Sequence, residues 1–257
     1  MSTLVNAEEL TAKVKEMYRQ VAEKPEASFH FELGRPLAVR LGYDVDVLDR
    51  IPAGAVESFA GVGFLFDLAN LREGDTVVDL GSGSGMDAFY AASLVGSTGR
   101  VFGVDFTAEQ LEKARRLAAD AGVDLIEFRE GRIESPPIDD GSADCVVSNG
   151  VINLSPDKAQ VFAAAARLLR PGGRLAVADI VTERQLTDSI IANADLWASC
   201  IGGAAQEDEY GAAIEAAGLR IATVRRNPYE FVSTRARNAS GTYGVKSISL
   251  LAIKPSR

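Results

Sequence analysis

The segment VVDLGSGSGMD combines an acidic residue with three closely spaced glycines. Gly81, Gly83 and Gly85 follow an apolar run, where a strand is expected to turn sharply into a helix. Glycines let the backbone approach a ligand closely, and the N-terminus of the next helix presents free N–H groups. Asp79 precedes the first glycine, and Asp105 ends the next apolar run, where a carboxylate can accept hydrogen bonds from both hydroxyls of a ribose. These residues favour a site for a nucleoside-containing cofactor.

Two other interpretations of the glycines remain open. An isolated G-x-G also occurs in turns that serve only packing. A nicotinamide-binding fingerprint would require glycine at the position of Met86 and has no need of an acid at Asp79. A dinucleotide therefore fits this segment less well than a cofactor with a single nucleoside.

An alternation of apolar runs and helical segments predicts the elements that position these residues. Strands are expected at TVVDL, RVFGVDF, LIEFRE, ADCVVSN and RLAVADI, with helices between most of them, and LRIATVRR and KSISLLAIK predict two closing strands. This order is typical of a doubly wound parallel sheet with helices on both faces. We expect an α/β fold of this kind.

Capping residues predict a helical segment ahead of the sheet. Asn6, followed three residues later by Glu9, begins a helix of capping-box type, and Pro25 ends it. The pieces that follow show no strand alternation and predict a cap of short helices and loops. We expect an N-terminal helical cap over residues 1–72 and a core domain over residues 73–257.

Several boundaries within the core are also predicted. Ser155, followed by Pro156, is expected to begin a helix. Residues 187–201 and 206–217 are expected to be helical. The polar loop 227–244 is the best candidate for a mobile segment.

Composition narrows the classes of function. A chain of 257 residues with 47% hydrophobic residues can bury one sizeable core. Its net charge of -9 argues against a nucleic acid or an anionic membrane as partner and favours a small molecule. No apolar run approaches the ~18 residues that span a bilayer, and no leader pattern begins the chain, so we predict a cytoplasmic protein. The sequence does not indicate an oligomeric state.

The cysteines and the single histidine do not predict a metal site. Cys145 and Cys200 cannot form a disulfide framework, and no cluster of Cys and His has metal-ligand spacing. With His30 as the only histidine, a zinc site and a histidine-centred triad with a cysteine nucleophile are both poorly supported.

Six separated motifs carry a family resemblance. They are VVDLGSGSGMD, GVDFTAEQLEKAR, GRIE, SNGVINLSPDK, RPGGRLAVADIV and WASCIGGA, and they cover the chain from about Tyr18 onward. Together they resemble class I S-adenosylmethionine (SAM) methyltransferases, most closely the arsenite methyltransferase branch. The resemblance implies a Rossmann-like sheet of seven strands, mostly parallel with the last strand antiparallel, and SAM as the cofactor over the strand ends.

The resemblance also assigns roles at the cofactor site. The methionine part of SAM is expected to lie against Gly81, Ser82, Gly83 and Gly85, with Asp79 holding that region; the ribose at Asp105; the adenine at Phe106, Ile133 and Glu134; and the sulfonium near the carbonyl of Asn149. Gln110 is a further cofactor candidate. Its role as the capping-box partner of Thr107 explains it equally well.

The same comparison marks a departure at the acceptor site. Arsenite methyltransferases hold trivalent arsenic between cysteine thiolates, and at the corresponding positions this chain has Gly150, Val62 and Cys200. One thiolate does not chelate a soft ion that needs two or three. Cys145 is expected to be an inert core residue within a strand. We predict that free inorganic arsenite is not the acceptor and that the pocket is roomier at Gly150.

Candidates for proton transfer lie in the expected cap. The titration range of His30 suits removal of a proton, but packing of its ring between Phe29 and Phe31 explains its presence equally well. Glu32 and Arg35 are nearby alternatives.

Three further residues could shape the reaction site. Tyr18 is expected to reach the SAM carboxylate or to close the site. Cys200 is a relic of a metalloid site, a wall of the substrate pocket or a buried helix residue, and its neighbours favour the pocket wall. Trp197 is a pocket candidate, although a core position is the more common role. We therefore predict His30, Tyr18 and Cys200 as catalytic residues, and Gly150, Trp197 and Cys200 as the substrate pocket.

These features lead to a ranked set of functions. The first is a SAM-dependent methyltransferase acting on a sulfur, oxygen or nitrogen atom of a small molecule. The second is an arsenic methyltransferase that takes thiol-bound or already methylated trivalent arsenic with Cys200 alone. A non-catalytic SAM-binding protein belongs to another class, and a nicotinamide-dependent reductase is the remaining alternative.

Overall fold

The computed structural model describes residues 6–29, 31–193, 197, 201–232 and 234–256. Its centre is one mixed sheet in the order β3-β2-β1-β4-β5-β8-β7, with β6 paired to β5. The strands are β1 Thr76–Leu80, β2 Arg100–Asp105, β3 Ile126–Glu130, β4 Ala143–Asn149, β5 Leu169–Thr182, β6 Ala205–Gln206, β7 Arg220–Arg226 and β8 Lys246–Ile253. β8 runs antiparallel to both β5 and β7. The predicted sheet, with its last strand antiparallel, is confirmed.

Helices cover both faces of this sheet. They are α1 Ala7–Glu23, α2 Gly34–Leu41, α3 Val45–Leu48, α4 Ala53–Glu57, α5 Phe66–Ala69, α6 Met86–Val95, α7 Ala108–Ala121, α8 Lys158–Leu168, α9 Asp188–Ile191, α11 Glu207–Ala216 and α12 Thr234–Tyr243, with the 3-10 helix η1 at Ile152–Leu154. One buried apolar cluster packs the helices from α1 through α7 against one face of the sheet. A second cluster packs α8 and α11 against the other face. None of the helices in the described part of the chain is long and apolar enough to span a membrane.

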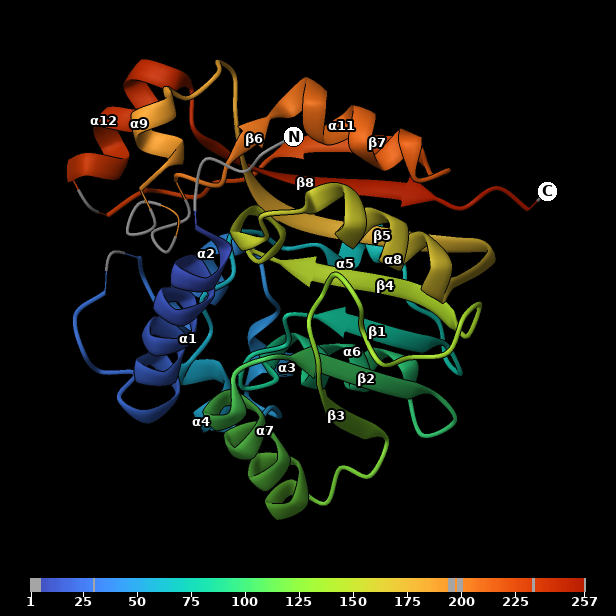
Figure 1. The fold of residues 1–257 in the computed structure, drawn as a ribbon. Coiled ribbons are helices and arrows are strands. Elements are labelled where there is room, and N and C mark those ends of the chain that lie inside the picture. Colours follow the sequence, from blue (N-terminus) through green and yellow to red (C-terminus); the bar gives the residue numbers. More distant parts are fainter. Residues whose placement is uncertain (1–5, 30, 194–196, 198–200, 233, 257) are drawn as a thin grey trace.

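The N-terminal helices lie beside the carboxyl ends of the parallel strands. In Figure 1 the arrowheads of β1 and β4 point toward α1, whereas the arrowhead of β8 points away from it. Ligands of open parallel sheets bind in the crevice outside these strand ends. The cap therefore covers the edge at which a cofactor site is expected.

The predicted helix start at Asn6 is confirmed, and the other end of α1 is held by α7. The side chain of Asn6 accepts hydrogen bonds from the backbone N–H groups of Glu8 and Glu9. At the far end, Gln110 donates to the carbonyl of Tyr18 at 2.8 Å and Lys113 donates to the carbonyl of Ala22 at 3.0 Å. The carbonyl of Ala22 is one that the last turn of a helix leaves free, and the bond to Tyr18 fixes the preceding turn.

The start of α8 differs from the prediction. Its N-cap is Asp157, whose carboxylate accepts from the backbone N–H of Gln160 at 2.9 Å. The hydroxyl of Ser155 donates instead to Glu134 at 2.6 Å, and Asn153 donates to the buried carboxylate of Asp179. The prediction that Ser155 caps this helix is therefore wrong by two residues, because Ser155 ends the 3-10 turn before it.

The segment 227–244 also differs from the prediction. Thr234–Tyr243 forms α12, and Gly244 N–H donates to the carbonyl of Ser240 at 3.0 Å. The segment contains Arg and Ala, which favour helices. Its polar composition is that of an exposed helix, so the prediction of a loop is wrong over Thr234–Tyr243. Within 187–201, the structure describes a helix at Asp188–Ile191.

Candidate functional site

Two adjacent cavities lie at the carboxyl ends of the strands. The first has about 470 Å³ of empty volume and is lined by Leu10, Thr11, Val14, Gly81, Asp105, Phe106, Arg132, Ile133, Glu134, Val151, Leu154, Ser155 and Pro156. The second has about 490 Å³ and is lined by Tyr18, Ala55, Ser58, Phe59, Ala60, Gly61, Asp79, Gly81, Ser82, Gly83, Ser84, Met86, Asp87, Gln110, Asn149 and Val151. Gly81 and Val151 line both. We call these the nucleoside cavity and the carboxylate cavity.

The glycine turn between β1 and α6 needs glycine for two physical reasons. Gly81 has φ +82°, a left-handed conformation that side chains disfavour, and a Cβ there would lie 2.5 Å from Val151. Gly85 has φ +94° and is the N-cap of α6, and a Cβ there would lie 2.7 Å from the ring of Phe128. Gly81 borders both cavities directly, whereas Gly85 supports the turn from behind.

Asp105 is held in place by backbone groups from two elements. Its carboxylate accepts from Gly83 N–H at 3.0 Å and from Thr107 N–H at 2.8 Å. Burial raises the pKa of Asp105, and these hydrogen bonds oppose that rise. A carboxylate has about four acceptor positions, so Asp105 retains the capacity to accept from a ligand in the nucleoside cavity.

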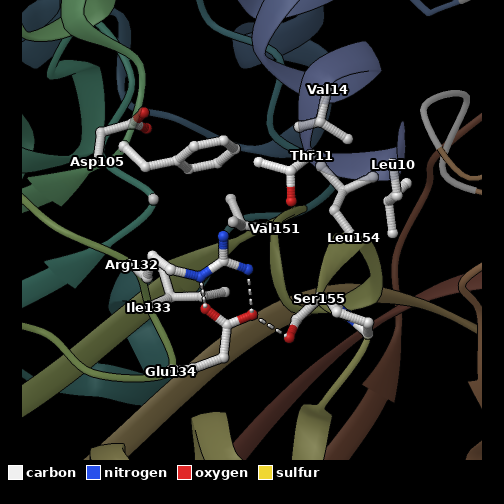
Figure 2. A pocket seen from close by; sticks show the side chains of 13 residues that line it. Leu10, Thr11, Val14, Asp105, Arg132, Ile133, Glu134, Val151, Leu154 and Ser155 are labelled. Carbon is white, nitrogen blue, oxygen red and sulfur yellow. Dashed lines mark hydrogen bonds and ion pairs between the residues drawn. The ribbon is translucent and has the colours of Figure 1, made fainter. Parts of the chain in front are cut away.

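The nucleoside cavity lies between α1 and the loops after β2, β3 and β4. Figure 2 shows Leu10, Thr11 and Val14 of α1 facing this cavity from the side opposite Ile133 and Glu134. Glu134 is held by an ion pair with Arg132 at 3.3 Å and by the hydroxyl of Ser155. The three α1 residues were not predicted, because their helical spacing is equally typical of an ordinary core face.

Two buried acids mark the carboxylate cavity. Asp79 is 2% exposed, and its Oδ2 has no hydrogen-bond partner among the described residues. Burial raises the pKa of Asp79 well above its usual range, and the nearby carboxylates of Asp87 and Asp105 raise it further. Asp87 accepts from Tyr43 O–H at 2.5 Å and from Asn149 Nδ2 at 2.9 Å. Burial raises the pKa of Asp87 to about 6, and these two bonds limit the rise.

Asp87 and Tyr43 were not recognised from sequence. Asp87 belongs to the glycine-rich segment VVDLGSGSGMD and lies in the first turn of α6. Its place in that segment was the feature of the sequence that could have identified it as a site residue. Tyr43 comes from the cap, 44 residues earlier in the chain, and no sequence pattern connects it with the site.

The two cavities fit the parts of SAM. Among the described residues that line the carboxylate cavity, none carries a positive charge, and an unpartnered carboxylate oxygen lies beside it. The methionine end of SAM carries an ammonium, a sulfonium and a carboxylate, and its net positive charge can offset such acids. Asp105, Phe106 and Ile133 in the nucleoside cavity supply an acid for ribose hydroxyls and apolar walls for a base.

Asn149 joins the end of β4 to a cap loop. Its Oδ1 accepts from Val62 N–H at 2.8 Å and Gly63 N–H at 3.3 Å. Its Nδ2 donates to the carbonyl of Gly63, to Tyr43 and to Asp87. The side-chain amide of Asn149 is thus engaged within the protein, while the residue still lines the carboxylate cavity.

Gln110 and Tyr18 connect α1 with the glycine turn. Ser84 donates its hydroxyl to Gln110 Oε1, and Gln110 Nε2 donates to the carbonyl of Tyr18. Thr107 makes no side-chain capping bond to α7, so the capping-box explanation of Gln110 is wrong. The ring of Tyr18 stacks on Phe31 at 6.2 Å, and the residue lines the carboxylate cavity.

Val62 and Gly150, the positions of two expected thiolates, lie against each other. Gly150 has φ +75°, and a Cβ there would lie 3.3 Å from Cγ1 of Val62. Val62 is 1% exposed, and neither residue lines the two cavities. The expectation of a roomier pocket at Gly150 is therefore wrong, because the valine side chain fills that space.

Trp197 is a buried packing residue in this structure. Its indole N–H donates to the carbonyl of Ile191 at 2.6 Å, and its side chain packs against Gly202 and Gly203. The ammonium of Lys158 lies 4.8 Å from the centre of its ring, and burial lowers the pKa of Lys158 to about 8. Trp197 does not line either of the two cavities.

The remaining residues that the sequence suggested for catalysis lie outside both cavities or outside the described residues. His30 and Cys200 lie outside the described residues. Glu32 pairs with Arg40, and Arg35 pairs with Asp49, in both cases on the surface. Cys145 is fully buried in β4, and burial raises its pKa to about 12, so its thiol is inert as expected.

Comparisons with known proteins point to one family. Residues 71–218 match the family model described as a methyltransferase domain. The arsenite methyltransferase of Halobacterium salinarum is 39% identical over 221 residues, which is 85% of this chain and 56% of that protein. The arsenite methyltransferase of Aquipseudomonas alcaligenes is 48% identical over 141 residues, 52% of this chain and 41% of that protein. The chain thus spans about half the length of these relatives.

A solved structure extends the same similarity to the fold. The arsenic(III) S-adenosylmethionine methyltransferase of Chlamydomonas reinhardtii superposes with a TM-score of 0.63 at 31% identity. The match covers 86% of this chain and 74% of that one.

Proposed function

Because this chain belongs to the class I SAM-dependent methyltransferases and is related to the arsenite methyltransferases, we propose that it methylates a small molecule other than free inorganic arsenite. The reacting atom of the acceptor is a sulfur, oxygen or nitrogen nucleophile. SAM supplies the activated methyl group, and the protein supplies orientation and exclusion of water.

The cofactor side of the site supports the first half of this proposal. Asp105 and Glu134 are already held by backbone and side-chain donors, so they require little rearrangement to meet a nucleoside. Leu10 and Val14 of α1 close the nucleoside cavity with apolar surface, which favours exclusion of water. The two acids of the carboxylate cavity complement a cationic methyl donor.

The proposal that free arsenite is not the acceptor rests on the contact between Val62 and Gly150. Neither position presents a thiol where the related enzymes are expected to present thiolates, and a Cβ added at Gly150 would lie 3.3 Å from Cγ1 of Val62. Soft trivalent arsenic needs more than one thiolate for stable binding. An acceptor that brings its own nucleophile fits this surface better than a bare metalloid ion does.

The test is incubation with SAM labelled in its methyl group. The acceptor panel contains thiols, hydrosulfide, phenols, amines, arsenite and methylated arsenicals, and products are identified by mass spectrometry. We expect a methylated organic or sulfur acceptor together with S-adenosylhomocysteine. Turnover of free arsenite would contradict the proposal, and tight SAM binding without turnover on any acceptor would favour a non-catalytic SAM-binding protein.

A matched pair of variants tests the acceptor argument separately. The double variant V62C/G150C restores two thiols, and we expect it to bind trivalent arsenic at least about tenfold more tightly than the parent chain, a gain of ~1.4 kcal/mol. V62A/G150A imposes the same backbone strain at position 150 without adding thiols. Equal arsenic binding by the two double variants would show that these positions do not control acceptor choice.

A second candidate is methylation of thiol-bound or already methylated arsenic. The retention of Cys200, the remaining thiol of the three expected positions, favours it. If this candidate holds, C200S loses turnover of such arsenicals while SAM affinity is kept. Unchanged turnover in C200S would eliminate it.

A further inference from the structure

The carboxylate cavity holds two acidic side chains that its surroundings do not neutralise. Asp79 and Asp87 both line it, and the described residues that line it include no Lys or Arg. The Oδ2 of Asp79 and the hydroxyl of Ser82 are buried without a hydrogen-bond partner among the described residues. Burying an ionised acid without a partner costs free energy, so these groups favour binding of a ligand that carries positive charge.

The groups that face Asp87 come from several elements. They are the phenol of Tyr43 from the turn after α2, the amide of Asn149 from β4, the carboxylate of Asp79 from β1 and the phenol of Tyr90 from α6 itself. None of these is a cation. Ionised Asp87 is therefore supported by neutral donors alone, and a bound cation would stabilise the ionised form further.

Asp87 is also connected to the acceptor side through Asn149. One proton of the Asn149 amide goes to Asp87, while Oδ1 holds Val62 N–H and Gly63 N–H. An amide group is planar, so a bond that fixes its nitrogen also fixes its oxygen. A hydrogen bond to an ionised acceptor is about twice as strong as one between neutral groups.

We propose that Asp87 is a positioning residue that responds to the positive charge of the methyl donor: the bound cation keeps Asp87 ionised, and ionised Asp87 fixes Asn149 and the loop that carries Val62. This inference rests on the proposed use of SAM. Donor binding releases the proton of Asp87 to solvent, and the product, whose sulfur is neutral, keeps Asp87 ionised less strongly. Loss of the methyl group thus loosens the loop beside the acceptor.

The first test uses the unaltered chain. Titration calorimetry at pH 6 in two buffers of different ionisation enthalpy counts the protons released on binding. Because the pKa of Asp87 is about 6 in the free protein, SAM binding should release about 0.5 proton from it. SAM affinity should fall about tenfold from pH 7 to pH 5, and S-adenosylhomocysteine should show a smaller proton release and a smaller fall.

The variant D87N assigns the effect to this residue. It should bind SAM about tenfold more weakly than the parent at pH 7 and show no affinity step near pH 6. D120N, at an exposed position of α7, is the control and should behave as the parent does. Hydrogen exchange at the backbone amides of Val62 and Gly63 measures how firmly the loop is held. In the parent, SAM should slow this exchange more than S-adenosylhomocysteine does. In D87N, the two ligands should slow it equally.

The outcomes separate this inference from the proposed function. SAM binding without proton release at pH 6, or a pH step that persists in D87N, overturns the role of Asp87 and leaves the methyltransferase proposal intact. Failure of the parent chain to bind SAM at any pH overturns both. If D87N does not fold, the calorimetry of the parent chain decides.

Discussion

The proposed cofactor side and the proposed acceptor side of this site are built in different ways. On the cofactor side, Asp105 is positioned by backbone N–H groups of Gly83 and Thr107, which belong to the same turns as the site itself. On the acceptor side, Val62 arrives from the cap and is positioned by Asn149, 87 residues away. The first depends on local backbone geometry, and the second on contacts between distant segments.

This difference explains how donor and acceptor specificity can vary separately. A side chain such as Val62 can change while the glycine turn and Asp105 keep their own hydrogen bonds. Asn149 and Asp87 are the residues through which the two sides touch. Variants at either side, and at the connection between them, can break or sharpen the comparison.

The largest effect is expected at the connection. N149A leaves Val62 N–H and Gly63 N–H without a partner and removes one of the two hydrogen bonds that Asp87 accepts, and the expected loss of unfolding free energy is about 3 kcal/mol or more. N153A is the matched control, because Asn153 follows the same strand four residues later but donates to Asp179. Urea unfolding measures the stability. Equal hydrogen exchange of Val62 N–H in both variants would refute the special role of Asn149.

On the cofactor side, D105A should weaken SAM binding about 100-fold, because charge-assisted hydrogen bonds contribute about 1.5–3 kcal/mol. Calorimetric SAM titration is the measurement. The exposed D120A serves as control and should bind SAM as the parent does. SAM affinity unchanged in D105A would mean that the cofactor side has been misassigned.

The glycine turn offers a comparison of two alanine substitutions. Gly81 and Gly122 have φ +82° and +65°, but a Cβ meets Val151 at 2.5 Å in the first and nothing within 4 Å in the second. G122A should cost about 1 kcal/mol of unfolding free energy, and G81A about 2 kcal/mol more, because Val151 must move. G81A alone should also weaken SAM binding. Similar losses for both would show that backbone strain, and not the close approach, makes glycine necessary.

The smallest effect is expected for Y43F. Loss of the phenol raises the pKa of Asp87, so the midpoint of SAM affinity should move above pH 6, and stability should fall by about 1 kcal/mol. On this proposal the protein binds SAM more tightly when Asp87 is ionised, so affinity is retained above the midpoint and lost as pH falls through it. Y210F removes a similar buried tyrosine–aspartate bond, to Asp179. It should cost comparable stability without moving the midpoint.

Much of the cofactor side was predictable from sequence. The positions of the glycine turn and Asp105 follow from strand ends, and strand ends are visible in apolar runs. The missed residues include Leu10, Thr11 and Val14, whose spacing is that of any amphipathic helix, and the bonded pair of Tyr43, which lies in the cap, and Asp87. The error at Ser155 arose because a 3-10 turn precedes α8, and the preference for a cap followed by proline does not reveal such a turn.

The amino-acid sequence by itself determined the sheet, the glycine turn and the absence of two expected thiols, because these depend on local patterns and residue identity. Only the tertiary structure decided what replaced the thiols. Val62 meets Gly150 across 88 positions of the chain, and Tyr43 meets Asp87 across 44. Such contacts arise when the cap packs on the strand ends, and the free energy of that packing is shared over many side chains, so no local pattern records it.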